Sequence, residues 1–345
     1  MSILKSDGID GIFLLSGEDS SIPMGEIDSL IRIYHPNTEI SSIGRRLVIA
    51  KNVNSDTVDI ISQRGAYVYI GGTLVTSIRN KVRVRGIERV DFRPFIQNDD
   101  GFAIRMMGTR DEAVKVKIET VIGSAVTRQF PSVRVNLSNP DVLIWGVEHS
   151  NILYLGCTRK WYRKKGWVQR RARSKPFFHA SALYPKFARA LVNLTMAREN
   201  ETILDPFCGT GTILQEASLM NIEAIGIDID KKMCMGTYRN LKHLDLKRTS
   251  IIRSDSTVLP VKAADVIATD LPYGRCSSTK GKTLRTILDS FLRDTCRILP
   301  RGRKATLVYP KGTKLILPSE LVLTQKHEIF MHTHLTRVIV VLERQ

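Results

Sequence analysis

The second half of the chain alternates short apolar segments with segments of helical periodicity, and this alternation constrains the fold more than any other feature. It predicts parallel strands joined by crossover helices, which is a doubly wound α/β fold. The apolar segments are largely uncharged, as expected for a sheet covered on both faces. The predicted strands are ETILDPF, EAIGIDID, SIIRSD, DVIATD, KATLVYP, HEIFMH and RVIVVLE.

An aspartate lies at or close to the C-terminal end of four of these predicted strands, namely Asp205, Asp228, Asp255 and Asp270. The carboxyl ends of parallel strands meet at one edge of a sheet, so these side chains should line one ligand crevice. A lone Asp at such a place is more often a turn or helix cap. The series favours a binding site instead, while Asp230 is interpreted as the N-cap of the next helix.

A glycine-rich turn follows the first of these strands, in ILDPFCGTGTILQEA. Gly209 and Gly211 would let a ligand approach the backbone at a helix N-terminus, but such a turn occurs in many nucleotide-binding folds. No Lys-Ser or Lys-Thr follows it, which excludes a Walker loop. Asp205 would repel a pyrophosphate and attract an ammonium group. The predicted cofactor is therefore a zwitterion, S-adenosylmethionine, with Asp228 on its ribose and Asp255 and Ser256 near its adenine.

The segment DLPYG, which begins at Asp270, resembles the Asp/Asn-Pro-Pro-Tyr/Phe signature of methyltransferases that modify amino groups on nucleobases or glutamine. A conjugated amino nitrogen is a poor nucleophile because its lone pair is delocalised. The Asp270 carboxylate and the Leu271 carbonyl could bind its N–H groups and turn the lone pair towards a methyl group. With Pro272, and with Tyr273 stacking on an extruded base, they form the predicted catalytic set. The bland alternative is an Asp-initiated turn with a surface Tyr, and the signature has proline where Leu271 stands.

The first half of the chain predicts two smaller α+β domains. Its elements follow the order βαββαβ of a ferredoxin-like unit over residues 1–78. Residues 79–158 contain ETVIGSAV and VNLSNPDVLIWGVE, which resemble the THUMP domain, an RNA-binding module attached to tRNA-modifying enzymes. A basic linker over residues 159–178 joins them to the Rossmann-like methyltransferase domain at 179–345.

Charge indicates the partner. The 345 residues carry a formal net charge of +18, which points to a polyanion, first of all nucleic acid. The stretch from Arg159 to Pro176 holds nine Lys or Arg and three aromatics, which suits single-stranded or loop RNA. An equally simple alternative is a solvated linker whose aromatics dock on a neighbouring domain. The predicted RNA contacts are Arg159, Lys160, Arg163, Lys164, Lys165, Arg170, Arg171 and Arg173.

Compartment and metal content are inferred from what the sequence lacks. Its five cysteines include no CxxC pair, which indicates free thiols and neither a disulfide framework nor a zinc site. No apolar run approaches the ~18 residues of a membrane span, and the first ten residues lack a secretory signal pattern. We expect a cytoplasmic protein without a metal.

Together these motifs resemble the archaeal tRNA (guanine-10-N2)-methyltransferase family. Three further segments of the chain also resemble parts of that family, namely FLLSGEDSSIPMGEIDSL, FFHASALYPKFARALVNL and MHTHLTRVIVV. The resemblance implies transfer of one or two methyl groups to N2 of a guanine in tRNA, most simply at position 10. It also implies that the segment around His179 closes over the cofactor, although the family has proline at Ala180. The implied cofactor set adds His179, Phe207, Thr210 and Ile229.

Several alternatives stay open. The same chemistry could act on another guanine in tRNA or ribosomal RNA, because the DLPYG motif indicates an amino nitrogen as the acceptor but not the position of the target nucleotide in the RNA. A DNA adenine methyltransferase and a non-catalytic RNA-binding protein are weaker alternatives. We expect a monomer, and a small activating subunit of the kind that eukaryotic relatives employ cannot be read from the sequence.

Overall fold

The computed structural model describes residues 8–18, 21–79, 83–108, 111–161, 166–256, 258–273, 281 and 283–345. The chain divides into two compact units, which we describe separately. One spans Met1–Gly17, Tyr34–Arg64 and Val68–Arg163, and the other spans Glu18–Ile33, Gly65–Tyr67 and Lys164–Gln345.

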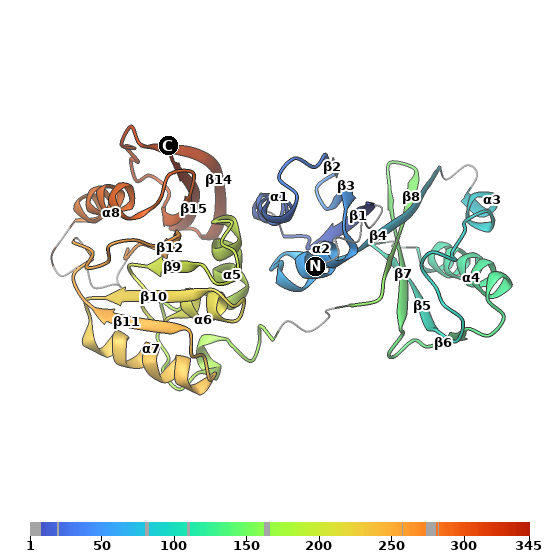
Figure 1. Ribbon diagram of the computed structural model, residues 1–345, viewed down its shortest axis with the longest axis horizontal. Helices are drawn as coiled ribbons and strands as arrows, with labels where there is room; N and C mark the ends of the chain where they lie inside the picture. Colours follow the sequence, from blue (N-terminus) through green and yellow to red (C-terminus); the bar gives the residue numbers. More distant parts are fainter. Residues whose placement is uncertain are drawn as a thin grey trace, which may run out of the picture. The chain divides into compact units, whose positions relative to one another are not determined.

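The first unit is built on one mixed sheet. Eight strands of the described residues pair in the order β2-β3-β1-β4-β8-β7-β5-β6. Figure 1 shows β4 beside β8, and these two strands are antiparallel. The elements are β1 (Ile9–Leu15), β2 (Ile40–Ile43), β3 (Leu47–Val53), α2 (Ser55–Arg64), β4 (Val68–Arg79), α3 (Arg83–Glu88), β5 (Gly101–Met107), α4 (Glu112–Gln129), β6 (Arg134–Val135), β7 (Val142–His149) and β8 (Ile152–Thr158).

The expected βαββαβ order is confirmed over the first part of the chain. Strands β1 to β4 form the array β2-β3-β1-β4, with helices α1 and α2 after β1 and β3. The sequence analysis missed the short elements α3 and β6. The predicted domains 1–78 and 79–158 share one hydrogen-bonded sheet, because β4 pairs with β8. The domain boundaries themselves stay predictions.

The second unit is a doubly wound α/β domain, as the alternation predicted. Its seven described strands pair in the order β11-β10-β9-β12-β13-β15-β14. The five strands from β11 to β13 are parallel, and β15 and β14 add an antiparallel hairpin. The elements are α5 (Pro185–Leu194), β9 (Thr202–Asp205), α6 (Thr212–Ser218), β10 (Glu223–Asp228), α7 (Lys231–His243), β11 (Thr249–Arg253), β12 (Val266–Asp270), α8 (Leu284–Ile298), β13 (Lys304–Pro310), β14 (Leu321–His332) and β15 (Leu335–Arg344).

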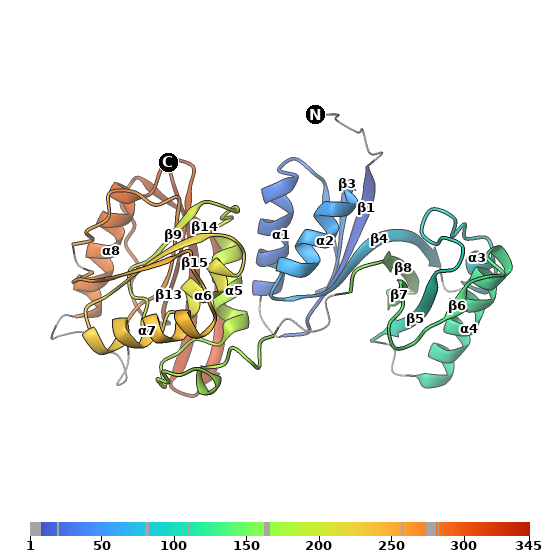
Figure 2. The same cartoon turned by 60° about the horizontal axis from the view of Figure 1, so that its bottom comes forward.

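Apolar cores lie on both faces of this sheet, which is why its strands read as continuous apolar runs. On one face, side chains of α5, α6 and α7 pack on the sheet, with Leu191, Leu214 and Leu241 in one cluster. On the other face, Phe291 of α8 packs in a second cluster. Figure 2 shows α8 set apart from α5 and α6 within this unit, and Figure 1 shows α7 and α8 on opposite sides of the strands.

Helix α1 (Ile22–Tyr34) belongs to the second unit for nearly all its length, which the sequence analysis did not anticipate. Its Glu26 is fully buried and accepts hydrogen bonds from the backbone N–H groups of Ala66 and Tyr67 and from the Asn193 amide. Just before the helix, the Ser21 hydroxyl lies 2.8 Å from Nδ1 of His327 on β14. These contacts hold α1 against the core of the second unit.

Candidate active site

The glycine-rich turn lies where the sequence placed it, between β9 and α6. Gly209 and Gly211 have φ values of 51° and 76°, in the left-handed region that glycine adopts without strain. A hydrogen bond from the Thr237 hydroxyl to the Gly209 carbonyl, 2.6 Å long, fixes the turn to α7. Thr210 is buried, and its carbonyl accepts from the Asn240 amide.

Asp205 ends β9 with its carboxylate buried. Its Oδ1 accepts from the Thr269 hydroxyl at 2.7 Å and from the Phe207 N–H at 3.2 Å. Burial raises the pKa of Asp205 to about 7, although these two hydrogen bonds favour the ionised form. A carboxylate held at such a cost is suited to a cationic ligand group, which would restore the lost solvation.

Asp228 ends β10 beside the same turn. Its Oδ2 accepts from the Gly209 N–H at 3.0 Å, and its Oδ1 accepts from the Asp230 N–H at 2.8 Å. Burial raises the pKa of Asp228, and these backbone hydrogen bonds oppose the shift. Asp230 caps α7 through the Lys232 N–H, so its predicted role as an N-cap is confirmed.

Four further residues of the predicted cofactor set lie in loops at the ends of these elements. Asp255 and Ser256 follow β11, and the Ser256 hydroxyl donates to the Pro206 carbonyl in the loop after β9. That bond links the ends of two strands. His179 precedes α5, and its Nδ1 lies 2.7 Å from the Ser181 hydroxyl. Ile229 follows Asp228 and is half-buried. Their cofactor contacts stay predictions.

Asp270 ends β12 in an apolar setting. Burial raises the pKa of Asp270 to about 6, and the charge of Arg337 and the nearby Tyr273 phenol oppose that shift. Its Oδ1 is buried and has no partner within hydrogen-bonding geometry among the described residues. A buried, unsatisfied carboxylate oxygen is costly in a folded protein and is expected where a ligand supplies the donor.

Leu271 and Tyr273 complete the structure of this motif. The Leu271 N–H donates to the Val308 carbonyl at 3.1 Å, and its side chain is buried in the second core cluster. Proline, which the signature has here, could not donate this bond. Tyr273 is half-buried against the same cluster, and burial raises the pKa of its phenol. Pro272 lies between them, and Gly274 is outside the described residues.

The sequence analysis missed Arg337 on β15. Its Nη2 lies 3.6 Å from Oδ2 of Asp270, although 67 positions separate the two residues in the chain. The antiparallel pairing of β13 with β15, which sets Pro310 opposite Arg337, brings it to this edge. The only signal in the sequence was a basic residue at the start of an otherwise apolar strand.

The residues at this edge of the sheet fit S-adenosylmethionine. A Cβ at Gly209 would meet no atom outside its chain neighbours nearer than 4.0 Å, so the turn leaves room for a ligand. Buried acids at three neighbouring strand ends, Asp205, Asp228 and Asp270, favour a ligand that carries positive charge. Among the described residues, no cluster of three His, Cys, Asp or Glu is arranged to hold a metal ion, and no helix could span a membrane.

Comparisons with known proteins agree with this geometry. Residues 171–339 match the family described as the RMKL-like methyltransferase domain. The chain is 30% identical to the tRNA (guanine(10)-N2)-dimethyltransferase of Methanothermobacter thermautotrophicus, over 96% of this chain and 98% of that protein. The chain belongs to the tRNA (guanine(10)-N2)-dimethyltransferase family. The enzyme of the same name from Methanocaldococcus jannaschii is 28% identical over 94% of this chain and 97% of its own length.

Solved structures support the fold. TrmN from Thermus thermophilus superposes with a TM-score of 0.56 at 17% identity, covering 97% of this chain and all of that one. The fold class, the enzyme class and S-adenosylmethionine as the methyl donor are therefore confirmed for this family member.

The basic stretch of this family member is partly occupied by internal contacts. Arg159 pairs with Asp100 at 2.8 Å and Lys160 with Asp59 at 3.0 Å. Arg170 pairs with the buried Glu216 at 2.7 Å. Arg171 lies over the Tyr184 ring and Arg173 is exposed, while Arg163, Lys164 and Lys165 lie outside the described residues. The RNA contacts of all eight stay predictions.

Two of the three aromatics in that stretch dock on protein. Trp167 packs against the first core cluster, with the guanidinium groups of Arg170 and Arg189 at 5.0 and 5.7 Å from its ring centroid. Trp161 packs against a cluster of the first unit, with Arg105 at 5.8 Å. For these two side chains the structure agrees with the docking alternative, and Tyr162 lies outside the described residues.

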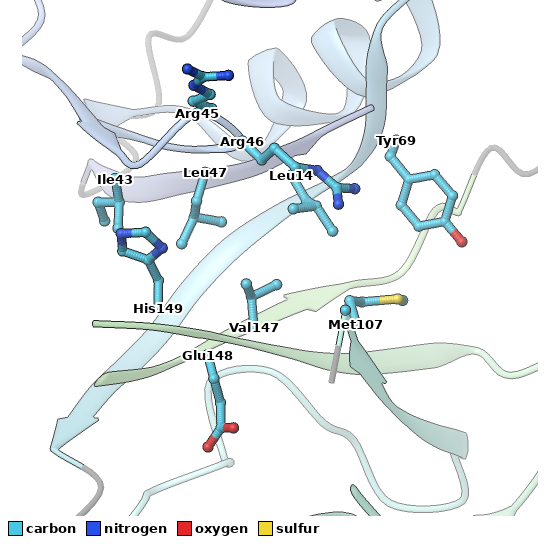
Figure 3. Close-up of a pocket in the computed structure, with 11 residues that line it drawn as sticks. Leu14, Ile43, Arg45, Arg46, Leu47, Tyr69, Met107, Val147, Glu148 and His149 are labelled. Atoms are coloured by element: carbon cyan, nitrogen blue, oxygen red, sulfur yellow. The ribbon is translucent and has the colours of Figure 1, made fainter. Parts of the chain in front are cut away.

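The first unit has a hollow of about 430 Å³ on its sheet (Figure 3). Leu14, Leu47 and Val147 form its apolar floor, while Arg46 and His149 come from opposite sides. Glu148 points away to the other side of its strand. Tyr69 is 49% exposed. A hollow with cations and an exposed aromatic is chemically suited to nucleic acid.

Proposed function

We propose that this protein transfers one or two methyl groups from S-adenosylmethionine to the exocyclic N2 of a guanine in tRNA, at position 10, as a step of tRNA processing. The family relationship supports the reaction, and both relatives described above carry position 10 in their names. The observation that carries the mechanism is the buried Oδ1 of Asp270, which has no hydrogen-bond partner among the described residues.

The predicted roles follow from this geometry. S-adenosylmethionine, when bound, supplies a methyl group on a positively charged sulfur. Asp270 accepts an N–H of the guanine amine, and the Leu271 carbonyl accepts the other, which turns the nitrogen lone pair towards the methyl group. Tyr273 stacks on the extruded base. The ionised form of Asp270 is required, and Arg337 favours it.

The tRNA itself is the proposed partner of both units. The net charge of +18 favours a polyanion, and the hollow of Figure 3 offers Arg45, Arg46 and Tyr69 to it. We propose that these residues contact tRNA outside the target nucleotide, together with exposed members of the basic stretch such as Arg173. A monomer in the cytoplasm is the simplest form in which this enzyme would act.

The test is methylation of an unmodified tRNA transcript, with the product nucleotide mapped by mass analysis. Asp270→Ala and Asp270→Asn should lower turnover by about 100-fold or more while cofactor binding persists. Asp289→Asn, which removes an exposed carboxylate paired with Arg285, is the matched control and should retain activity. Normal turnover by Asp270→Ala would contradict the proposed mechanism. Methylation of a different guanine would contradict position 10 as the target.

A further inference from the structure

Arg337 reaches the reaction site from β15 and has no role in the mechanism described above beyond its charge. Its guanidinium lies 3.6 Å from Asp270 and 5.7 Å from the Phe187 ring centroid. The side chain is 17% exposed, and that of Asp270 is 16% exposed. Its charge also acts on the Tyr273 phenol. Arg337 therefore lies beside two residues of the predicted catalytic set.

This ion pair leaves hydrogen-bonding capacity unused on both sides. Within the described parts of the chain, Nε of Arg337 and Oδ1 of Asp270 are buried without a partner. Ion pairs that serve only stability gain from having their remaining donors and acceptors satisfied. A neighbouring donor and acceptor left open in this way fit a ligand that presents an acceptor next to a donor.

The Watson–Crick edge of guanine presents such a row: the O6 acceptor, the N1–H donor and the N2 amine. Adenine instead places an amine at position 6 and only a hydrogen at position 2. We propose that Arg337 reads O6 of the target guanine while Asp270 holds its N2 amine, so that Arg337 is a specificity-determining residue. This inference rests on the proposed function, and it names which base the site accepts and how.

The structure also allows a simpler role, in which Arg337 only keeps Asp270 ionised and oriented. The two roles differ in one respect. A residue that reads O6 loses its effect when the substrate has no O6, whereas a residue that acts through Asp270 affects every substrate alike. A double-mutant cycle between the protein and the base separates them.

The experiment compares tRNA carrying guanine at the target nucleotide with the same tRNA carrying 2-aminopurine, which keeps the 2-amine and lacks O6. The native enzyme should prefer guanine in kcat/KM. Arg337→Met should lower that preference by about 10- to 100-fold. Loss of the arginine should lower kcat/KM for guanine and leave kcat/KM for 2-aminopurine unchanged. The analogue also lacks N1–H, but both enzymes lose that contact, so the ratio of preferences reports O6.

Arg303→Met is the matched control. Arg303 pairs with Glu201 at the amino ends of strands β13 and β9, whereas Asp270 lies at the carboxyl end of β12. This control variant should keep the native preference. Arg337→Lys, which retains a donor, should recover part of it. Cofactor affinity and thermal melting report whether each variant folds. An equal loss on both substrates in Arg337→Met would overturn the proposal and assign Arg337 to positioning. Failure of the native enzyme to methylate guanine in tRNA would instead overturn the proposed function.

Discussion

At the scale of single residues, the predicted contact of the Asp205 carboxylate with the cofactor would link cofactor binding to pH. Burial raises the pKa of Asp205 to about 7, so the side chain is mostly protonated at pH 6 and mostly ionised at pH 8. Only the ionised form would make the proposed pair with the cofactor ammonium. We predict that cofactor affinity, measured by calorimetry, rises by about tenfold between pH 6 and pH 8. In Asp205→Asn this rise should vanish, leaving only the titration of the cofactor itself. A native affinity independent of pH would contradict the assignment.

At the scale of elements, a buried carboxylate contributes to holding α1 in the second unit. Glu26 accepts from two backbone N–H groups and from Asn193, and Glu26→Ala leaves these donors unsatisfied. We predict a loss of about 3 kcal/mol in the free energy of unfolding, measured with urea. Asp28→Ala on the same helix breaks only an exposed pair with Arg32 and should cost less than about 0.5 kcal/mol. Equal losses in the two variants would show that burial of Glu26 does not anchor the helix.

At the scale of the whole molecule, the net charge of +18 should make tRNA binding strongly dependent on salt. Each phosphate contact adds about 0.9 to the slope of log affinity against log salt on duplex regions. We predict that Arg45→Ala, at the rim of the hollow in Figure 3, lowers this slope by about one without changing cofactor affinity. Arg93→Ala is the control, because Arg93 does not line that hollow, and it should leave the slope unchanged. An unaltered slope in Arg45→Ala would remove that hollow from the RNA surface.

Local patterns in the amino-acid sequence were sufficient to predict the doubly wound domain and the aspartates at the ends of its strands. Apolar periodicity is a local property, and parallel strands joined by helices must end at one edge of their sheet. Asp205, Asp228 and Asp270 could therefore be placed at one edge of the sheet from the sequence alone. The cap role of Asp230 is equally local, because it depends on the two residues that follow.

Contacts between residues far apart in the chain, in contrast, were set by tertiary packing. The register of β13 with β15 sets Arg337 against Asp270, and chain packing sets Arg170 against Glu216 and Glu26 against Asn193. No periodicity encodes such pairs, because each depends on how whole elements pack. A basic residue can face solvent or form an ion pair inside the protein. For Arg170, burial of its partner Glu216 decides between the two.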